Sequence, residues 1–362
     1  MADRIWNFGA GPAALPEPVL HTAQRDIWNI ANSGIGISEH SHRGKVFDRV
    51  IKEAETACRE LAGIPDEYDV LFLQGGASLQ FAMVPMNLLP AGQTADYLVT
   101  GVWSQKAVAE AQKLGKVHEA VSAESTKFDR IPPVEAIKYS ANPAYVHITT
   151  NNTIYGTQWT TEPAVPAGVP LVADASSDIY SRPIDPRKYG LIYAGAQKNL
   201  GPSGVVLVII RKELVEGAPS TIPAILQYRT HAKEPSLYNT PNTFGIYLMG
   251  EVFKWIRSEG GLAGMAARNE AKANLLYGAL EESKLFRIRA QNGSRSRMNV
   301  VFLGPNEATD NRFVAEATKR GLEGLKGHRS AGGLRASLYN AMPLAGVQAL
   351  VDFIREFERA NG

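Results

Sequence analysis

One lysine stands where a nucleophilic amine could work. Lys198 lies in the stretch LIYAGAQKNLGPSGVVLVII, residues 191–210, between apolar runs at 191–194 and 205–210. Both runs have the length and β-branched content of buried strands. A lysine at the edge of a core is partly desolvated, which lowers the pKa of its amine and favours the nucleophilic form. The same stretch is also compatible with an ordinary hairpin whose ammonium stays in water.

A carboxylate and a glycine-rich turn could serve the same chemistry. Residues 170–173 form an apolar run that leads into Asp174, and a buried carboxylate needs hydrogen bonds or a cation. Upstream, the apolar run 69–73 opens onto Gln-Gly-Gly-Ala-Ser at 74–78, before a helical stretch at 79–89. Backbone N–H groups at such a turn hold phosphate, with the Ser78 hydroxyl as a further donor. The Walker pattern is absent from the sequence, which favours a phosphorylated cofactor other than a nucleoside triphosphate.

Further polar and aromatic residues follow other predicted strands. Trp103 comes after the apolar run 97–100, and its indole either stacks on a planar ligand or caps the core. Thr153 lies in a polar turn after the run 145–149. Carboxyl ends of strands in an open α/β sheet form the edge at which ligands bind. A basic cluster with His42 and Arg43 precedes a predicted helix, and it is either a solvated helix start or an anion site.

Composition bounds the class of protein. The 362 residues are 44% hydrophobic and 20% charged with a net charge of +2, which is typical of a globular protein and unlike a nucleic-acid-binding one. The lone Cys58 falls on an apolar helix face, so we expect it in the core and expect neither a disulfide nor a cysteine metal site. No targeting segment and no apolar run of ~18 residues is found, so we expect a cytoplasmic protein that does not bind membranes.

The chain length predicts two lobes. We expect an extended arm at 1–15, a large cofactor-binding domain at 16–260 and a small α+β domain at 261–362. In the small domain, glycines at 327, 332 and 333 surround His328, Arg329 and Arg335. A guanidinium fork is a natural receptor for carboxylate or phosphate oxygens. The alternative is a solvated basic loop.

Motifs along most of the chain show a family resemblance. The sequence resembles the phosphoserine aminotransferase family, of the class V aminotransferases and fold-type I pyridoxal-phosphate enzymes. The matching motifs, from residue 7 to about 342, are FGAGPA, SHRG, QGGAS, TGVWS, NNTIYGTQ, VADASSD, GAQKNLGPSG, YNTPNTF and GHR…GGLRASLYNA. The resemblance implies an α/β fold, with a mostly parallel seven-stranded sheet flanked by helices and a smaller α+β domain.

The resemblance also implies roles toward pyridoxal 5′-phosphate. Lys198 would hold the aldehyde as an imine, Asp174 would bind the pyridinium and Trp103 would stack on the ring, and these three are the expected catalytic residues. The other expected cofactor contacts are Ala77, Ser78, Thr153, Gln197, Asn239 and Thr240. Of these, Asn239 and Thr240 would reach the cofactor of the neighbouring subunit, which implies a homodimer with shared active sites. No metal is implied.

The substrates follow from the same resemblance. It implies amino transfer from L-glutamate to 3-phosphohydroxypyruvate, giving O-phospho-L-serine and 2-oxoglutarate, with 4-phosphohydroxy-L-threonine as a second product. Lys198 would move the substrate proton as general base and then acid. The expected substrate-binding residues are Arg335 for the α-carboxylate, and His42, Arg43, His328 and Arg329 for the distal anion. Some family members have arginine in place of Ser78 and serine in place of Ala10, so the charge facing the substrate phosphate is expected to be distributed differently here.

Two alternatives stay open. Another class V enzyme, such as a cysteine desulfurase, needs a mobile cysteine near the C-terminal part of the chain, where this sequence has none. A non-catalytic protein that only binds pyridoxal phosphate would also retain Lys198. Such a protein would not need Arg335 to bind a substrate carboxylate. An assay with an amine donor distinguishes an aminotransferase from a protein that only binds the cofactor.

Overall fold

A central sheet carries the residues of interest. The computed structural model describes residues 4–361. The sheet has the order β2-β10-β9-β8-β5-β3-β4, and its strands are parallel except β10, which runs antiparallel to both neighbours. The strands are β2 (Tyr68–Leu73), β3 (Thr94–Val99), β4 (Lys116–Ser122), β5 (Val146–Thr149), β8 (Leu171–Asp174), β9 (Leu191–Gly195) and β10 (Val206–Arg211). The predicted mostly parallel, seven-stranded sheet is confirmed.

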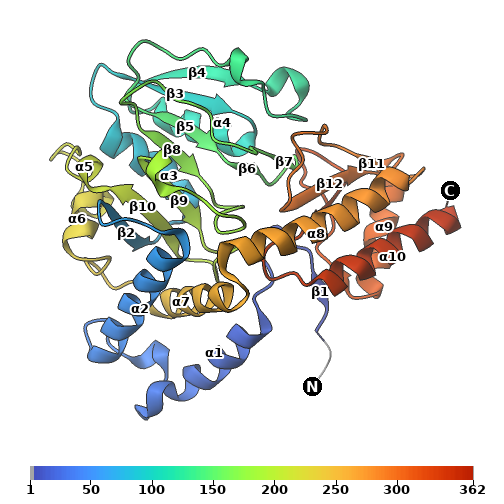
Figure 1. Ribbon diagram of the computed structural model, residues 1–362, viewed down its shortest axis with the longest axis horizontal. Helices are drawn as coiled ribbons and strands as arrows, with labels where there is room; N and C mark the ends of the chain where they lie inside the picture. The colour runs from blue at the N-terminus through green and yellow to red at the C-terminus, as the bar shows by residue number, and fades with distance from the viewer. Residues whose placement is uncertain (1–3, 362) are drawn as a thin grey trace.

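Helices cover both faces of this sheet (Figure 1). On one face α2 (Lys45–Ala62) packs against α7 (Thr243–Ser258), and α1 (Glu17–Asn29) lies on α7. On the other face α3 (Gly76–Leu88) packs against α4 (Val102–Ala111). Shorter elements complete the large lobe: β6 (Asn151–Asn152), β7 (Thr157–Gln158), α5 (Lys212–Val215) and α6 (Tyr228–Lys233).

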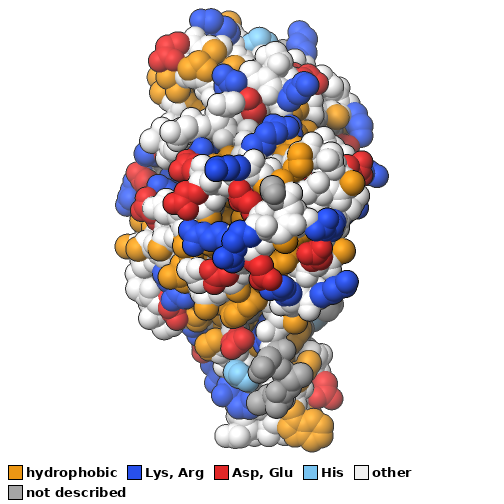
Figure 2. Space-filling model, turned by 90° about the vertical axis from the view of Figure 1, so that its right-hand side faces the viewer, with side chains coloured by type: hydrophobic (Ala, Val, Ile, Leu, Met, Phe, Trp, Pro, Cys, Tyr) orange, Lys and Arg blue, Asp and Glu red, His pale blue; other side chains and the backbone are white. Residues whose placement is uncertain are grey.

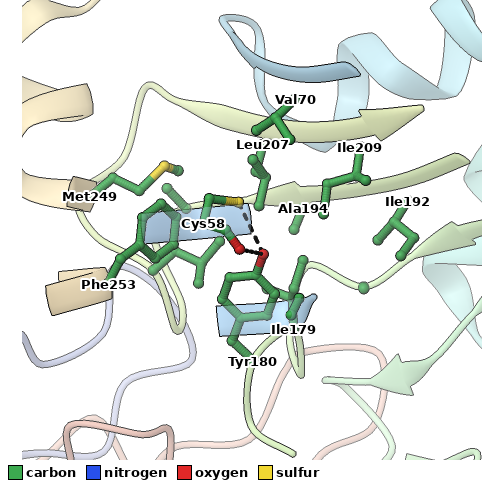
Figure 3. Packing of buried hydrophobic residues seen from close by; sticks show 14 of the residues in the cluster. Cys58, Val70, Ile179, Tyr180, Ile192, Ala194, Leu207, Ile209, Met249 and Phe253 are labelled. Carbon is green, nitrogen blue, oxygen red and sulfur yellow. Dashed lines mark hydrogen bonds between the residues drawn. The ribbon is translucent and has the colours of Figure 1, made fainter. Parts of the chain in front are cut away.

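Cys58 belongs to the core between α2 and the sheet, as predicted (Figure 3). Its side chain is fully buried, and its Sγ lies 3.0 Å from the Tyr180 hydroxyl, which also donates to the Cys58 carbonyl oxygen at 3.1 Å. Burial raises the pKa of the Cys58 thiol to about 12. A thiol in this state is not the mobile nucleophile that a cysteine desulfurase needs.

The C-terminal residues form a second layer of sheet and helices. Helix α8 (Gly261–Glu282) runs from the large lobe to the strands β11 (Arg287–Ile288), β12 (Asn299–Leu303) and β14 (Leu334–Ser337), which form an antiparallel sheet (Figure 1). Helices α9 (Glu307–Lys319) and α10 (Leu344–Asn361) cover it. We retain residue 261 as the proposed domain boundary, because α8 begins there and residues from 273 onward share a separate core cluster.

The predicted N-terminal arm crosses to this small lobe. Strand β1 (Trp6–Asn7) pairs in parallel with β13 (Leu322–Glu323), and Phe8 is fully buried in the small-lobe core. Residues 1–3 of the arm lie outside the described part of the chain. Further along the arm, the Ala13 backbone N–H donates to the Gln197 carbonyl oxygen of the large lobe at 2.9 Å, so the arm contacts both lobes.

The surface shows mixed charge. On the face in Figure 2, basic and acidic side chains are interspersed, in keeping with the net charge of +2. No helix within residues 4–361 is long and apolar enough to cross a membrane.

Candidate active site

A cavity of ≈ 380 Å³ opens where the carboxyl ends of β5, β8 and β9 face the small lobe. Its lining comes from both lobes: Ala10, Gly11, Gly76, Ala77, Ser78, Phe81, Trp103, Thr153, Ile154, Asp174, Ser176, Gln197, Lys198, His328 and Arg335. Three larger cavities, of ≈ 820, ≈ 590 and ≈ 570 Å³, lie away from these residues. The smaller one is the candidate active site, because its side chains include most of the predicted ones.

Lys198 lies in the turn between β9 and β10, and its Nζ donates a hydrogen bond of 3.0 Å to Thr153 Oγ1. Burial lowers the pKa of the Lys198 amine to about 8, although the charge of Asp174 acts in the opposite direction. The nearby Arg335 guanidinium lowers this pKa further. A substantial fraction of the amine is therefore neutral near pH 8, as a nucleophile or general base requires.

Asp174 is the last residue of β8 and is 5% exposed. Its Oδ1 accepts a 3.0 Å hydrogen bond from the Ser176 backbone N–H. Burial raises the pKa of the Asp174 carboxyl, while the Ser176 hydrogen bond and the Lys198 charge lower it. A carboxylate enclosed in this way is stabilised by a further cationic partner, and the cavity has room for one beside it.

The glycine-rich turn ends at the start of α3. Gly75 has φ +84, and a Cβ there would lie 2.5 Å from Leu79 Cδ2, so only glycine fits. The helix begins at Gly76, three residues earlier than the sequence predicted, because two consecutive glycines with positive φ make the turn. The first N–H groups of a helix have no intrahelical acceptor, so Ala77 and Ser78 present an anion site to the cavity.

Trp103 lies in the first turn of α4 rather than at the end of a strand, which corrects the prediction. The helix begins immediately after β3 because Ser104 Oγ accepts hydrogen bonds from the N–H groups of Thr100 and Gly101, at 3.0 and 3.1 Å. Lys106 Nζ lies 4.6 Å from the centre of the Trp103 ring, and Lys198 Nζ lies 5.9 Å from it. The indole thus forms a wall of the cavity beside the lysine.

Two small-lobe side chains offer donors for anions. Arg335, on β14, reaches the Thr153 carbonyl oxygen at 3.4 Å, and its buried Nε has no partner among residues 4–361. Ser330 donates its backbone N–H to His328 Nδ1 at 3.2 Å, so the neutral ring carries its proton on Nε2. Burial and the charges of Arg335, Arg329 and Lys106 lower the pKa of His328. This positive surrounding suits an anionic ligand.

Several predicted site residues lie outside this cavity. His42, Arg43, Asn239, Thr240 and Arg329 do not contribute to its lining. Arg43, Asn239, Thr240 and Arg329 are exposed and His42 is half-buried. The roles that the sequence predicts for them stay predictions.

The loop with Asn239 and Thr240 does approach the glycine-rich turn. Gln74 Nε2 donates to the Thr240 carbonyl oxygen at 3.1 Å. The loop therefore lies at the same edge of the sheet as the anion site.

Sequence reasoning missed part of the lining. Gly11, Phe81, Ile154 and Ser176 were not predicted. Phe81 lies one helical turn after Ala77, and Ser176 lies two residues after Asp174, so helix periodicity and turn geometry could have indicated both. The sequence carries no comparable signal for Gly11, which approaches the side chains of Gln197 and Lys198 from a distant part of the chain.

Comparisons with known proteins define the family. Residues 5–350 match the family Aminotransferase class-V. The phosphoserine aminotransferases of Herpetosiphon aurantiacus and Geobacillus kaustophilus are 53% and 52% identical to this chain, covering 99% and 98% of it and 99% of each relative. A solved phosphoserine aminotransferase from Bacillus circulans subsp. alkalophilus superposes with a TM-score of 0.97 at 48% identity, covering 99% of both chains.

A further solved structure carries the cofactor. The pyridoxal-phosphate-bound phosphoserine aminotransferase of Trichomonas vaginalis has a TM-score of 0.93 at 40% identity, covering 97% of this chain and all of that one. The chain belongs to the class V aminotransferases and is a pyridoxal-phosphate-dependent aminotransferase of fold type I. Within that family, its full-length relatives at about half identity are phosphoserine aminotransferases.

Proposed function

We propose that the enzyme transfers the amino group of L-glutamate to 3-phosphohydroxypyruvate, giving O-phospho-L-serine and 2-oxoglutarate. The observation that carries this proposal is the pairing of a desolvated amine with free anion donors in one cavity. Lys198 has a pKa of about 8, and Arg335 and His328 line the same space. Both substrates carry an α-carboxylate and a distal anion, so both need these donors.

The cavity residues fit pyridoxal phosphate. Asp174 is buried with a raised pKa, which a cationic ring nitrogen would relieve. The first turn of α3 offers Ala77 and Ser78 to a phosphate, and Trp103 offers an aromatic face. Thr153 and Gln197 complete the lining next to Lys198. When bound, the cofactor supplies an aldehyde that takes up the amino group and a ring that accepts electron density.

The protein's own residues then bind and move protons. Neutral Lys198 would accept the proton from the substrate Cα as general base and, once protonated, would deliver it as general acid to the cofactor carbon that carries the amino group, because its lowered pKa makes both forms accessible near pH 8. The hydroxyl of Thr153, 3.0 Å from Lys198 Nζ, holds the amine in place. Arg335 would orient the substrate through its α-carboxylate, since its Nε has no partner among residues 4–361 and only Nη1 donates within the chain, over a long 3.4 Å contact to the Thr153 carbonyl oxygen.

The distal anion would meet a group of donors at the mouth of the cavity. His328 lines the cavity with Nε2–H free to donate, and the charge of Arg329 acts on it. His42 and Arg43 lie outside the cavity of their own chain. We propose that they serve the same anion in the site of a second subunit.

This arrangement implies a homodimer with shared active sites. Asn239 and Thr240 are exposed beside the glycine-rich turn, where they can extend to a neighbouring subunit's cofactor phosphate. Apolar side chains are also exposed near the start of the chain, with Trp28 83% and Ile27 51% exposed on α1. Such exposure is typical of a surface that another chain covers. A cytoplasmic location stays a prediction.

Selectivity for a phosphorylated keto acid tests the proposal. At neutral pH the phosphate carries nearly two charges, and a charge-assisted hydrogen bond contributes about 1.5–3 kcal/mol. Replacing Arg329 or Arg43 by Ala should therefore lower kcat/KM for 3-phosphohydroxypyruvate by roughly 10- to 100-fold, with much less effect on hydroxypyruvate. Arg335→Ala should impair both substrates, because both keep the α-carboxylate.

Steady-state assays with L-glutamate as the amino donor give kcat/KM of each variant for the two keto acids. Arg312→Gln, at an exposed arginine on α9, is the matched control and should change neither substrate. Similar kcat/KM values of the unchanged enzyme for both keto acids would reject the substrate assignment. Absence of any amino transfer would favour a protein that only binds the cofactor.

A further inference from the structure

A second cationic hollow lies at the junction of the two lobes, away from the candidate active site. This cavity of ≈ 590 Å³, which we call the interlobe groove, shares none of its lining residues with the active-site cavity. Its large-lobe wall includes Gln158, Trp159 and Arg182. Its small-lobe wall includes Tyr277 on α8 and the arginines at 295 and 297. Three arginines and a single carboxylate, that of Glu281, line it.

The arginines of the interlobe groove are only partly neutralised. Arg182 lies 3.9 Å from Glu162, whose oxygens already accept from Lys188 Nζ at 3.0 Å and from the Tyr189 hydroxyl at 2.9 Å. Its other contacts are 3.3 Å hydrogen bonds to the carbonyl oxygens of residues 159 and 160. Burial raises the pKa of the Asp178 carboxyl and the Arg182 charge acts to lower it, but no hydrogen bond joins the two side chains, so the Arg182 guanidinium keeps donor capacity for an anion.

The two remaining arginines have exposed partners. Arg297 pairs with Glu270 at 3.2 Å, and both side chains are about half exposed. Arg295 pairs with Glu281, whose side chain is also more than half exposed. The half-exposed Arg297–Glu270 pair contributes little free energy, so a multivalent anion can compete for the Arg297 guanidinium group.

Two buried donors at this groove have no acceptor. Trp159 is 4% exposed, and its Nε1 has no hydrogen-bond partner within residues 4–361. The Nε of Arg295 is likewise buried and unpartnered in the described part of the chain. Buried N–H groups are normally paired. These two N–H groups lie within the groove wall and add positive electrostatic potential to it, while the guanidinium groups supply the donors on its surface.

The groove walls are held in position by hydrogen bonds between the lobes. The Gln158 backbone N–H donates to the Ser294 carbonyl oxygen at 2.9 Å, and the Arg297 backbone N–H donates to Gln158 Oε1 at 3.0 Å. The Arg295 guanidinium lies 5.1 Å from the centre of the Tyr277 ring. Figure 1 shows the β6–β7 hairpin reaching β12 and α8 at this junction. The donors are thus preorganised, which reduces the cost of binding.

We propose that the interlobe groove binds a small oxyanion with two or more negative charges, such as a phosphate monoester or a dicarboxylate. Multiple guanidinium forks and N–H donors match carboxylate or phosphate oxygens. Because Arg182 belongs to the large lobe and the other two arginines to the small lobe, the bound anion would stabilise one arrangement of the lobes. The proposal is independent of the substrate assigned to the active site.

Calorimetric titration of the holoenzyme with inorganic phosphate and with malonate tests the proposal, with chloride at matched ionic strength as the reference. An Arg329→Ala/Arg335→Ala background weakens anion binding at the active site, so the heat that Arg182→Gln or Arg297→Gln removes in this background reports the groove. We expect one site per chain in this background. Arg182→Gln should raise its dissociation constant at least tenfold, and the exposed Arg297→Gln should weaken it several-fold while leaving the melting temperature unchanged.

A control variant and the choice of anion show whether the measured binding belongs to the interlobe groove. Arg312→Gln, at an arginine on α9 that has an exposure similar to that of Arg297 and does not line the groove, should leave the binding unchanged. Binding of phosphate alone, of malonate alone or of both identifies the favoured oxyanion and supports the site. No saturable heat in the double-variant background would overturn the proposal, as would binding that survives both Arg182→Gln and Arg297→Gln.

Discussion

Burial shifts the pKa values of two ionisable side chains, Lys198 and Asp174, in opposite directions. Desolvation disfavours the charged form of each, so it lowers the pKa of the amine and raises that of the carboxyl. Their mutual attraction opposes both shifts. The balance leaves the amine available for proton transfer and the carboxylate in need of a cation.

The lowered pKa of Lys198 predicts a pH-dependent stability of the cofactor-free protein. Lysine in an unfolded chain titrates near 10.5, and Lys198 in the fold titrates near 8. Between these values the unfolded state binds more protons, so the free energy of unfolding should rise with pH. Lys198→Met removes this term and should give a flatter profile between pH 8 and 10.5. Urea unfolding at several pH values measures the free energy of unfolding of the wild type and of Lys198→Met. Lys113→Met, at an exposed lysine, is the control. Identical pH profiles of the wild type and Lys198→Met would contradict the lowered pKa of Lys198.

Asp174→Asn keeps the shape of the side chain and removes its charge. We expect the cofactor to bind still, because the phosphate turn and Trp103 are unchanged. The Cα proton transfer should slow by orders of magnitude, each tenfold being about 1.4 kcal/mol of barrier. Single-turnover kinetics with L-glutamate measure the step, and retained cofactor absorbance shows that binding is intact. A near-normal single-turnover rate would exclude the role proposed for this carboxylate.

At the scale of elements, the strands were easier to predict than the helix starts. Buried parallel strands are continuous apolar runs, so β2, β8 and β9 appear where the sequence indicates them. The start of α3 lies three residues earlier than predicted because glycine occupies its first turn, where propensity carries little information.

The meeting of β8, β9 and β14 in one cavity depends on contacts between distant parts of the chain. Periodicity cannot indicate such contacts, and only the family resemblance suggested that Asp174, Lys198 and Arg335 act together. For His42 and Arg43 the sequence predicted only a role toward the distal anion, and the proposal that they act in a second subunit's site rests on their position outside the cavity of their own chain.

The loop between β13 and β14 depends on a glycine that tolerates no side chain. A Cβ at Gly327 would lie 2.2 Å from the Gly332 carbonyl oxygen and 2.6 Å from that of Gly333. Gly327→Ala should therefore displace His328 and Arg329, and raise KM for the phosphorylated keto acid at least several-fold with little loss of cofactor. Gly278→Ala, at a helical glycine with open space, is the control. An unchanged KM in a folded Gly327→Ala protein would show that this loop does not position the donors.

At the scale of the whole molecule, the active site combines two lobes and, as we propose, two chains. Strand β1 of the arm pairs with β13 of the small lobe, and the Tyr339 hydroxyl donates to the Ala10 carbonyl oxygen at 2.8 Å. Because Ala10 lines the cavity, the position of the small lobe affects the shape of the cavity. The site in one chain has Lys198, Asp174 and Arg335 but not the loop with Asn239 and Thr240. A closed dimer with two-fold symmetry would bring that loop to each site from the partner.

Mixed dimers test this sharing. A Lys198→Ala chain and an Asn239→Ala/Thr240→Ala chain should each be nearly inactive alone. In a mixed dimer with shared sites, the site that contains Lys198 receives the unchanged loop from the other chain and is intact, whereas the second site carries both defects. Random exchange at equal amounts should restore about a quarter of wild-type activity, since half of the dimers are mixed and half of their sites work. Exchange is verified by native mass spectrometry. If the loop served its own chain, every site would carry one defect, and no activity would return.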